Sequence, residues 1–211
     1  MENPIYVVIL LFVAYLTYRL ISSKKRERYI EEYNFPKKVN EKIVSTYPHL
    51  TEKDVEKVIK ALREYFLICR VAKLRMVSMP SQVVDVAWHE FILFTRGYHE
   101  FCKKGLGKFL HHTPAEAMQS QTIAQKGIKR AWRLSCKREN IHPKAAHKLP
   151  LLFSIDSELN IPDGFKYSLN CTNDDDRYCA GHIGCGGVGT GGCCGDGGGD
   201  GGGGSGCGGG S

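Results

Sequence analysis

The sequence predicts a mainly α-helical protein with an N-terminal transmembrane helix, a small helical domain and a disordered tail rich in glycine and cysteine. Three observations predict this fold class. Residues 5–21 are almost wholly apolar, apolar residues recur at helical spacing in the centre of the chain, and 19 of the 24 glycines lie between positions 181 and 210. We therefore divide the chain into a transmembrane anchor (5–21), a basic juxtamembrane segment (22–47), a helical domain (48–170) and a tail (171–211).

The apolar run over residues 5–21 is interrupted only by Thr17 and Arg19. At about 1.5 Å of rise per residue, the run reaches the lower limit of length for crossing the hydrocarbon core of a bilayer. A cleavable signal peptide would carry basic residues before its apolar run, whereas here the basic residues 24–28 follow it. The flanks favour an uncleaved, single-pass anchor. The positive-inside rule then places the N-terminus outside and the rest of the chain in the cytoplasm.

Three segments after the apolar run have their own signals. Residues 25–47 predict a juxtamembrane helix interrupted at Phe35-Pro36, because proline removes a backbone donor and restricts the residue before it. Thr51 can cap the amide of Asp54 and open a helix that runs to about Arg75. A second helix is expected over about 81–104, closed by the glycines that follow it.

A third helix is expected over about 114–139. It opens with the sequence Thr113-Pro114-Ala115-Glu116, which combines a threonine cap, a proline at the first helical position and a glutamate at the third. Residues 140–170 contain prolines, short apolar runs and turn residues. We expect them to cover the helices as irregular chain, with a short strand pair as the alternative.

The formal net charge of +7 is concentrated in one part of the chain. Residues 103–148 contain eleven Lys or Arg against two acidic residues. Next to an anchored helix, this charge favours a surface that faces the anionic headgroups of membrane lipids. An ordinary solvated helix face explains the pattern equally well. Nucleic acid is disfavoured as a partner, because no recognisable binding motif accompanies the charge.

The residues that best suggest a specific site begin at Asp85 and include an acid, an indole, an imidazole and a thiol. They are Asp85, Trp88, His89, Leu93, Tyr98 and Cys102. This pattern resembles the signature of the glycine-rich domain-containing protein family, which reads Asp-x-x-Trp-His-x-His-x-Leu and then Tyr-x-x-Asp-Cys. Phe91 stands where that pattern has its second histidine, and Phe101 stands where it has an acid. The resemblance covers residues 79–112 and implies a membrane-anchored relative of that family, without implying a particular activity.

Asp85 and His89 are the candidate catalytic residues. They are four positions apart, so on a helix they are neighbours on one face. A carboxylate beside an imidazole favours its charged form and fixes its orientation. The pair therefore suits a general base, part of a metal site or a structural hydrogen bond, and the structural role is the commonest one for such pairs.

His99 and Cys102 are three positions apart and could supply two ligands to one zinc ion. His111 or His112 could fold back after the Gly105–Gly107 turn and add a third ligand. His89 lies about 20 Å from Cys102 along a continuous helix. A single site containing both would need a break near Gly97 or a histidine from another segment. The alternative is an aromatic core with histidines at its edge.

The tail offers a second set of soft ligands. Cys179, His182 and Cys185 are spaced three residues apart, but the surrounding coil lacks the apolar residues that a zinc-stabilised fold needs. A flexible tail with unassigned thiols is therefore the favoured interpretation. Three cysteines lie instead within the predicted helices, Cys69, Cys102 and Cys136, where we expect them to pack as small hydrophobic residues.

No phosphate loop, nucleophile elbow, paired metalloprotease histidines or dinucleotide fingerprint occurs in the sequence. We expect a non-enzymatic domain, held at the cytoplasmic face of a membrane, that binds a protein partner. The alternative is a metal-dependent or hydrolytic activity at Asp85 and His89 and at the region of His99, Cys102 and His112, with zinc as the cofactor. A concave pocket in which these polar residues converge would favour the alternative.

Overall fold

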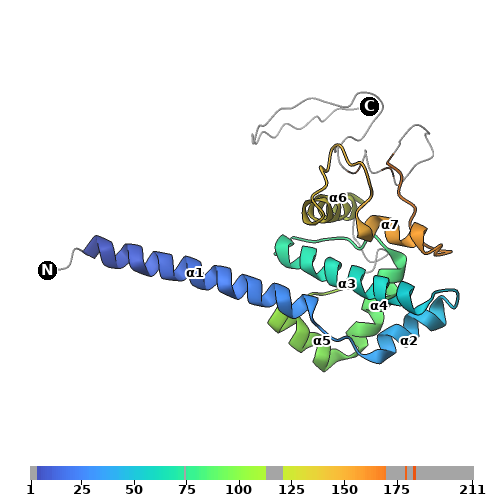
Figure 1. The fold of residues 1–211 in the computed structure, drawn as a ribbon, viewed down its shortest axis with the longest axis horizontal. Coiled ribbons are helices and arrows are strands. Elements are labelled where there is room, and N and C mark those ends of the chain that lie inside the picture. Colours follow the sequence, from blue (N-terminus) through green and yellow to red (C-terminus); the bar gives the residue numbers. More distant parts are fainter. Residues whose placement is uncertain (1–3, 74, 113–120, 170–178, 180–182, 184–211) are drawn as a thin grey trace, which may run out of the picture.

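The computed structural model describes residues 4–73, 75–112, 121–169, 179 and 183, and these residues form a mainly helical structure (Figure 1). The helices, in chain order, are α1 (Pro4–Glu31), α2 (Lys37–Thr46), α3 (Glu52–Ala72), α4 (Gln82–Leu93), α5 (Thr95–Phe101), the π-helix η1 (Cys102–Leu106), α6 (Gln121–Arg138) and α7 (Leu151–Glu158). No strand occurs in this part of the chain. The mainly α fold class and the N-terminal apolar helix are confirmed. Almost all of residues 171–211 lie outside the described residues, so the disorder of the tail stays a prediction.

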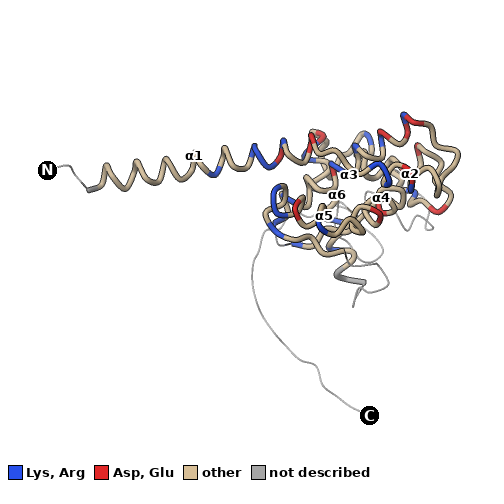
Figure 2. The backbone as a smooth tube through the Cα atoms, turned by 90° about the horizontal axis from the view of Figure 1, so that it is seen from below, with Lys and Arg blue, Asp and Glu red and all other residues tan. Residues whose placement is uncertain are grey.

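Helix α1 projects from one side of the domain as a single continuous rod (Figure 1). Its apolar part is fully exposed, and the helix is long and apolar enough to cross a membrane. In Figure 2 the outer half of α1 is free of the blue and red that mark charged residues, and Arg19 and then the basic residues 24–28 follow toward the domain. The expected interruption at Phe35-Pro36 is present between α1 and α2. The anchor and the first part of the juxtamembrane segment, however, form one helix.

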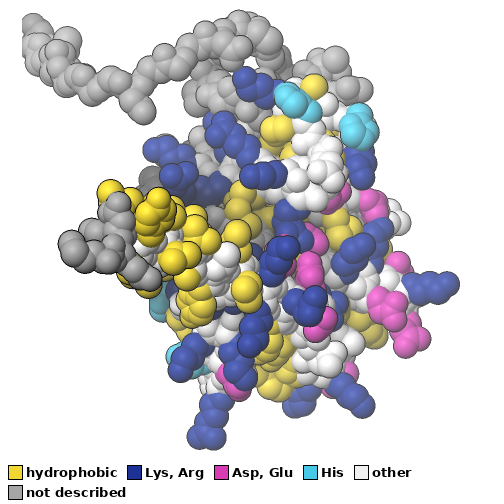
Figure 3. Space-filling model, turned by 60° about the vertical axis from the view of Figure 1, so that its left-hand side comes forward, with side chains coloured by type: hydrophobic (Ala, Val, Ile, Leu, Met, Phe, Trp, Pro, Cys, Tyr) yellow, Lys and Arg dark blue, Asp and Glu magenta, His cyan; other side chains and the backbone are white. Residues whose placement is uncertain are grey.

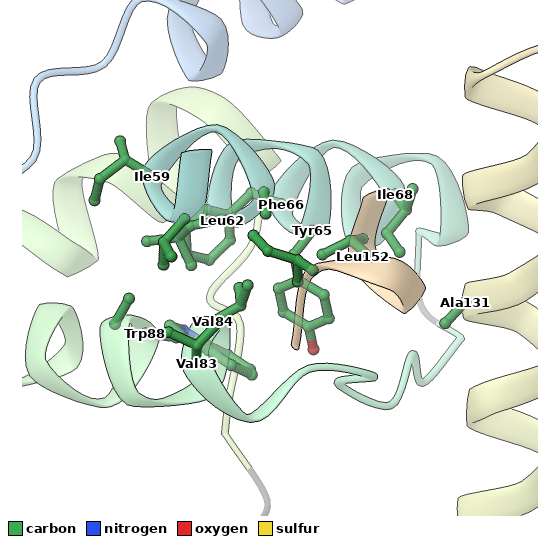
Figure 4. Close-up of a cluster of buried hydrophobic side chains, with 14 of the residues drawn as sticks. Ile59, Leu62, Tyr65, Phe66, Ile68, Val83, Val84, Trp88, Ala131 and Leu152 are labelled. Carbon is green, nitrogen blue, oxygen red and sulfur yellow. The ribbon is translucent and has the colours of Figure 1, made fainter. Parts of the chain in front are cut away.

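Helix α3 is the central element of the domain. Its start follows the predicted capping: the Thr51 hydroxyl accepts from the Asp54 amide at 3.4 Å, and the Asp54 carboxylate accepts from the Thr51 amide at 2.9 Å. Eleven of its 21 residues are buried, which is why α1, α2, α4, α6 and α7 can all pack against it. Figure 4 shows its side chains lying against those of α4, with Leu62, Tyr65 and Phe66 on one side and Val83, Val84 and Trp88 on the other.

The expectation of a single helix over 81–104 is wrong in one respect, because the structure divides this segment into two helices before the π-helix. Helix α4 ends at Leu93, Phe94 adopts ψ 59°, and α5 starts again at Thr95. The break lets two successive helices direct aromatic side chains into one core, where the Phe91 ring lies 5.4 Å from that of Tyr98 and 5.3 Å from that of Phe101. Helix α5 continues directly into the π-helix η1. Gly107 caps the end of η1, and its φ of 79° suits glycine.

The expectation of irregular chain over 140–170 is also wrong in part, because this segment contains the helix α7. Pro150 precedes this helix, and Leu152, Phe153 and Ile155 are buried. The short strand pair considered there is absent from the described residues, in which Ser168 and Cys179 form an isolated bridge. Helix α6 covers most of the third predicted helix. The proposed capping sequence at 113–116 lies outside the described residues.

The inner end of α1 is bonded directly to the domain. Arg26 donates to the carbonyl of Lys103 at 3.1 Å, in η1. Glu27 forms an ion pair with Arg138 of α6 at 3.0 Å. Ile30 is fully buried, and Gly105 lies so close to it that an added Cβ would approach Ile30 Cγ1 to 2.8 Å. The anchor therefore enters the domain without a flexible linker.

Candidate metal centre

Three potential metal ligands meet at the surface of the domain: Asp85, His89 and His112. His112 Nε2 lies 3.0 Å from Asp85 Oδ1 and 3.0 Å from His89 Nε2. His89 Nε2 lies 3.6 Å from Asp85 Oδ2. The ligand atoms all lie within 4.8 Å of one another. Two of these residues come from α4 and the third from the segment that follows η1.

Helix α4 places Asp85 and His89 on one face, one turn apart, and α7 fixes the start of that helix. The buried carboxylate of Asp156 accepts from the Ser81 hydroxyl at 2.7 Å and from the Gln82 amide at 2.7 Å. The Ser81 hydroxyl in turn accepts from the Val84 amide at 3.3 Å. A negative charge at the first turn of a helix satisfies free amides and matches the helix dipole. Asp85 therefore lies in a first turn of α4 that Asp156 holds in place.

Tyr98 fixes the segment that carries His112. Its hydroxyl accepts from Trp88 Nε1 at 3.2 Å and donates to the carbonyl of Leu110 at 2.5 Å, two residues before His112. The Trp88 ring also packs edge-on against the His112 ring, with centroids 4.4 Å apart. Two residues of the sequence signature, Trp88 and Tyr98, thus position the third ligand without being ligands themselves.

The arrangement of donor atoms suits a transition metal. Zinc holds nitrogen and oxygen ligands at about 2.0–2.1 Å, so two ligands of a tetrahedral zinc stand about 3.3 Å apart. His112 Nε2 lies 3.0 Å from both Asp85 Oδ1 and His89 Nε2, and the second carboxylate oxygen, Oδ2, lies 3.6 Å from His89 Nε2, so the separations are close to that value. Two imidazoles and one carboxylate form a common ligand set for zinc and for non-haem iron(II).

The three side chains also form a compact hydrogen-bonding cluster, in which both ring nitrogens of His112 have a neighbour: Nδ1 lies 3.3 Å from His89 Nε2. His112 Nε2 faces Asp85 Oδ1 and His89 Nε2 at the same distance of 3.0 Å. The ring nitrogens of a histidine donate or accept according to the tautomer, so this cluster can be held by hydrogen bonds, and the same donor atoms are placed to hold a cation.

The three side chains of the centre differ in how much of their surface is exposed to solvent. The side chains of His112, Asp85 and His89 are 13%, 23% and 51% exposed. His112 is held against the protein, while His89 faces solvent. An ion bound here would therefore have coordination positions open to water, as in catalytic rather than structural zinc sites.

The other predicted ligands of this region lie elsewhere. Cys102 is completely buried behind Tyr98, and burial raises the pKa of its thiol, which disfavours the thiolate that metals bind. His99 and His111 both pack against Phe109, at centroid distances of 6.0 and 4.7 Å. The expected grouping of His112 with His99 and Cys102 is therefore corrected: His112 lies with His89.

The reason for this correction is the path of the chain. The separation of about 20 Å expected between His89 and Cys102 assumed one straight helix. The helix breaks at Phe94, and the chain that returns after Gly107 brings His112 to His89 of α4. This is the histidine from another segment that a joint site requires. Phe91 and Phe101 are fully buried in the aromatic core, so the side chain at position 91 points away from the centre.

Leu93 belongs to the sequence signature, whereas Asp156 does not. The signature residue Leu93 is 70% exposed, one turn after His89. Sequence reasoning missed Asp156, which supports α4. Its signal is an acid placed directly after the apolar run 149–155, since a buried carboxylate needs partners.

Two of the tail candidates, His182 and Cys185, lie outside the described residues. Cys179 is described, and it is buried and disulfide-bonded. Its sulfur is therefore not available as a thiolate ligand in this structure.

Comparison with known proteins gives one match. The family model described as UCP032817-like matches residues 25–186, which include all three residues of the candidate centre. Searches of curated proteins and of solved structures found no match. The resemblance to glycine-rich domain-containing proteins stays a prediction. Because the family model covers the whole helical domain and well over half of the sequence, the chain belongs to the UCP032817-like family.

Proposed function

We propose that this chain is a membrane-anchored metal-binding domain in which Asp85, His89 and His112 hold one divalent transition-metal ion, with zinc as the first candidate. The observation that carries the proposal is the convergence of two imidazoles and one carboxylate at the separations of a coordination sphere. The side chains come from two segments, and a buried network of Asp156, Trp88 and Tyr98 supports them.

A hydrolytic role is the activity that such a centre supports best. Zinc with three protein ligands lowers the pKa of a bound water to about 7 and supplies a nucleophile at neutral pH. The half-exposed His89 leaves this position accessible to a substrate. The protein would supply the ligands and their orientation through Trp88 and Tyr98.

Binding of a protein partner, the role expected from the sequence, has less support from the described surface. Outside α1, the large apolar residues that are exposed there are Val44, Val71, Leu93 and Phe109. Apolar residues exposed singly are ordinary on protein surfaces. A protein partner therefore stays a prediction, and metal binding is the function that the geometry favours.

We also propose that α1 spans the membrane once, with the domain in the cytoplasm. The basic residues 24–28 support this orientation through the positive-inside rule. The disulfide at Cys179 is the observation that favours the opposite side, because disulfides persist in oxidising compartments. Labelling of intact cells with an impermeant thiol reagent after mild reduction decides between them: we expect no label, and strong labelling of the tail would reverse the orientation.

The metal proposal is tested by measuring the metal content of the purified full-length protein. We expect about one zinc per chain in the wild type and a loss of most of it in the Asp85→Asn and His112→Ala variants. His99→Ala and His111→Ala are the matched controls, because they remove neighbouring histidines that lie outside the centre. Unfolding curves of all variants show whether a loss of zinc reflects a loss of structure.

Metal bound by the tail must be separated from metal at the centre. A variant with every cysteine after position 170 changed to serine should keep its zinc if the centre binds it. Cobalt in place of zinc should give the spectrum of a nitrogen and oxygen site, without sulfur charge-transfer bands. Zinc that disappears with the tail cysteines, or that remains in His112→Ala, would exclude the proposal.

A further inference from the structure

A basic groove lies between the C-terminal end of α3 and helix α6. Its volume is about 700 Å³, and six of its nine lining residues are basic while none is acidic. The basic residues are Lys73, Arg75, Lys126, Lys129, Arg130 and Arg133. Exposed Val71 and half-buried Leu134 add apolar surface to the same groove.

The charge of this groove is not neutralised by the described residues. The nearby carboxylates are already paired, since Glu27 and Glu64 bind Arg138 and Glu27 also lies 3.9 Å from Arg70. None of the six basic side chains of the groove forms an ion pair with a residue that the structure describes, and Arg130 donates instead to the carbonyl of Met76. Like charges gathered in a concave surface repel one another and attract an anion.

The groove lies where α1 leaves the predicted membrane span. Arg70, next to Val71 of the groove, donates to the carbonyl of Ser23 at 2.5 Å and to its hydroxyl. Ser23 comes two residues after Ile21, the last residue of the apolar run, which is about 3 Å of helical rise. The polar headgroup layer begins at that depth and is several ångströms thick, about 5–7 Å on each side of the hydrocarbon.

The basic side chains near the point where α1 leaves the domain agree with this placement. Figure 3 shows Lys and Arg side chains on the face from which the apolar helix projects toward the reader. When α1 crosses a bilayer, this face of the domain is turned toward the leaflet. A soluble anion could reach the groove from any direction, but a headgroup is held beside it by the anchor itself.

We propose that this groove binds the phosphate-bearing headgroup of an anionic phospholipid in the leaflet that α1 crosses. Guanidinium groups bind phosphate oxygens in pairs, and lysines add charge without fixed geometry. Val71 and Leu134 suit the apolar part of the lipid next to its phosphate. The groove is separate from Asp85, His89 and His112, so the lipid site does not depend on the metal.

The test compares the full-length protein with two triple variants of equal charge. Lys126→Gln, Lys129→Gln and Arg133→Gln remove charge from the groove, while Lys53→Gln, Lys60→Gln and Lys137→Gln remove it from exposed positions elsewhere on α3 and α6. Each protein is incorporated into nanodiscs of phosphatidylcholine with a minor fraction of phosphatidylserine. Native mass spectrometry then counts the lipids that stay bound when the protein is released from the nanodisc.

We expect the wild type and the surface variant to retain phosphatidylserine in preference to phosphatidylcholine, and the groove variant to lose this preference about tenfold or more. Equal retention by the two variants would overturn the proposal. If inorganic phosphate in detergent binds the groove as tightly and displaces the lipid, the groove is a soluble-anion site and the lipid assignment fails. Unchanged zinc content of the groove variant shows that the two proposals are independent.

A second measurement does not depend on the folding of a variant. Phosphatidylserine with a photoreactive diazirine near its headgroup should crosslink to wild-type peptides that contain residues 71–75 and 126–134. The yield should fall as salt concentration rises, since exposed charges are screened. Crosslinks confined to α1, with none in these two segments, would overturn the proposal.

Discussion

At the scale of single residues, Tyr98 is the side chain on which the geometry of the centre most depends. Its hydroxyl is the shared partner of the Trp88 indole and the Leu110 carbonyl, and it is almost completely buried. Burial raises its pKa, so the hydroxyl stays protonated and able to donate. The two segments that carry the proposed metal ligands are thus joined by a single oxygen atom.

Replacing Tyr98 with Phe should lower both the stability of the domain and its affinity for zinc. The Trp88 N–H and the Leu110 carbonyl would lose their partner, which costs about 1–3 kcal/mol of unfolding free energy. Tyr29→Phe is the control, because the Tyr29 hydroxyl makes no hydrogen bond with a described residue. Urea unfolding and competition with a zinc chelator give the two quantities. Equal values for the two variants would contradict the role assigned to Tyr98.

The three cysteines of the helical domain illustrate burial at the same scale. Burial raises the pKa of Cys69 to about 12 and that of Cys136 to about 11, and it also raises the pKa of Cys102. All three are free thiols packed in the core, as the sequence predicted. We expect iodoacetamide at mildly alkaline pH to leave them unmodified in the native protein and to modify them after denaturation. Peptide mapping checks this, and rapid native labelling of Cys102 would contradict the buried position.

At the scale of elements, the contact between α7 and the start of α4 matters most. The Asp156 carboxylate accepts from Ser81, Gln82 and Val83 of the α4 cap and from the amide of Phe165 at 2.9 Å. A short helix late in the chain therefore holds the helix that carries two of the three proposed metal ligands.

Asp156→Ala should destabilise the domain by about 3 kcal/mol or more, because several buried donors lose their acceptor. Glu158→Ala on the same helix is the control. Glu158 pairs with Lys57 at the surface, and such exposed pairs contribute at most about 1 kcal/mol. Thermal and denaturant unfolding measure the difference. If both variants lose the same stability, the capping role of Asp156 is not supported.

The elements also show what a sequence can and cannot predict. Helix α3 was predictable because its cap and its apolar periodicity are local. The break at Phe94 was not predicted: the sequence offered Gly97 as a place where the helix could break, but the observed position depends on aromatic packing between distant segments. The proximity of Asp85 to His89 follows from helical spacing, whereas the arrival of His112 requires the long-range bond from Tyr98 to Leu110. Helix α7 has eight residues, too few to show a clear period.

At the scale of the whole molecule, the joint between α1 and the domain sets how the protein is placed. Ile30 packs against Gly105 of η1, and Arg26 bonds to the carbonyl of Lys103. This joint and the ion pairs of Glu27 make the inner end of α1 part of the folded domain.

Gly105→Ala should weaken that joint, because the new methyl group would overlap Ile30 Cγ1. Overpacking of this kind costs about 1–3 kcal/mol. Gly97→Ala is the matched control: its Cβ would meet Tyr33 Oη at 3.9 Å, an ordinary contact, and alanine is the better helix former. Unfolding curves and spin-label distances between α1 and α6 check this. A rigid, fully stable Gly105→Ala protein would contradict the close packing.

If α1 spans a bilayer as proposed, its continuity with the domain also determines how the protein meets membranes of different thickness. Residues 5–21 extend about 25 Å, less than the roughly 30 Å hydrocarbon core of an average bilayer. A protein with a loose tether could let its helix sink or shift on its own, but α1 cannot move without moving the domain. The hydrophobic mismatch therefore has to be absorbed by the lipid, through local thinning around the helix, and such thinning favours the thinner membranes of a cell.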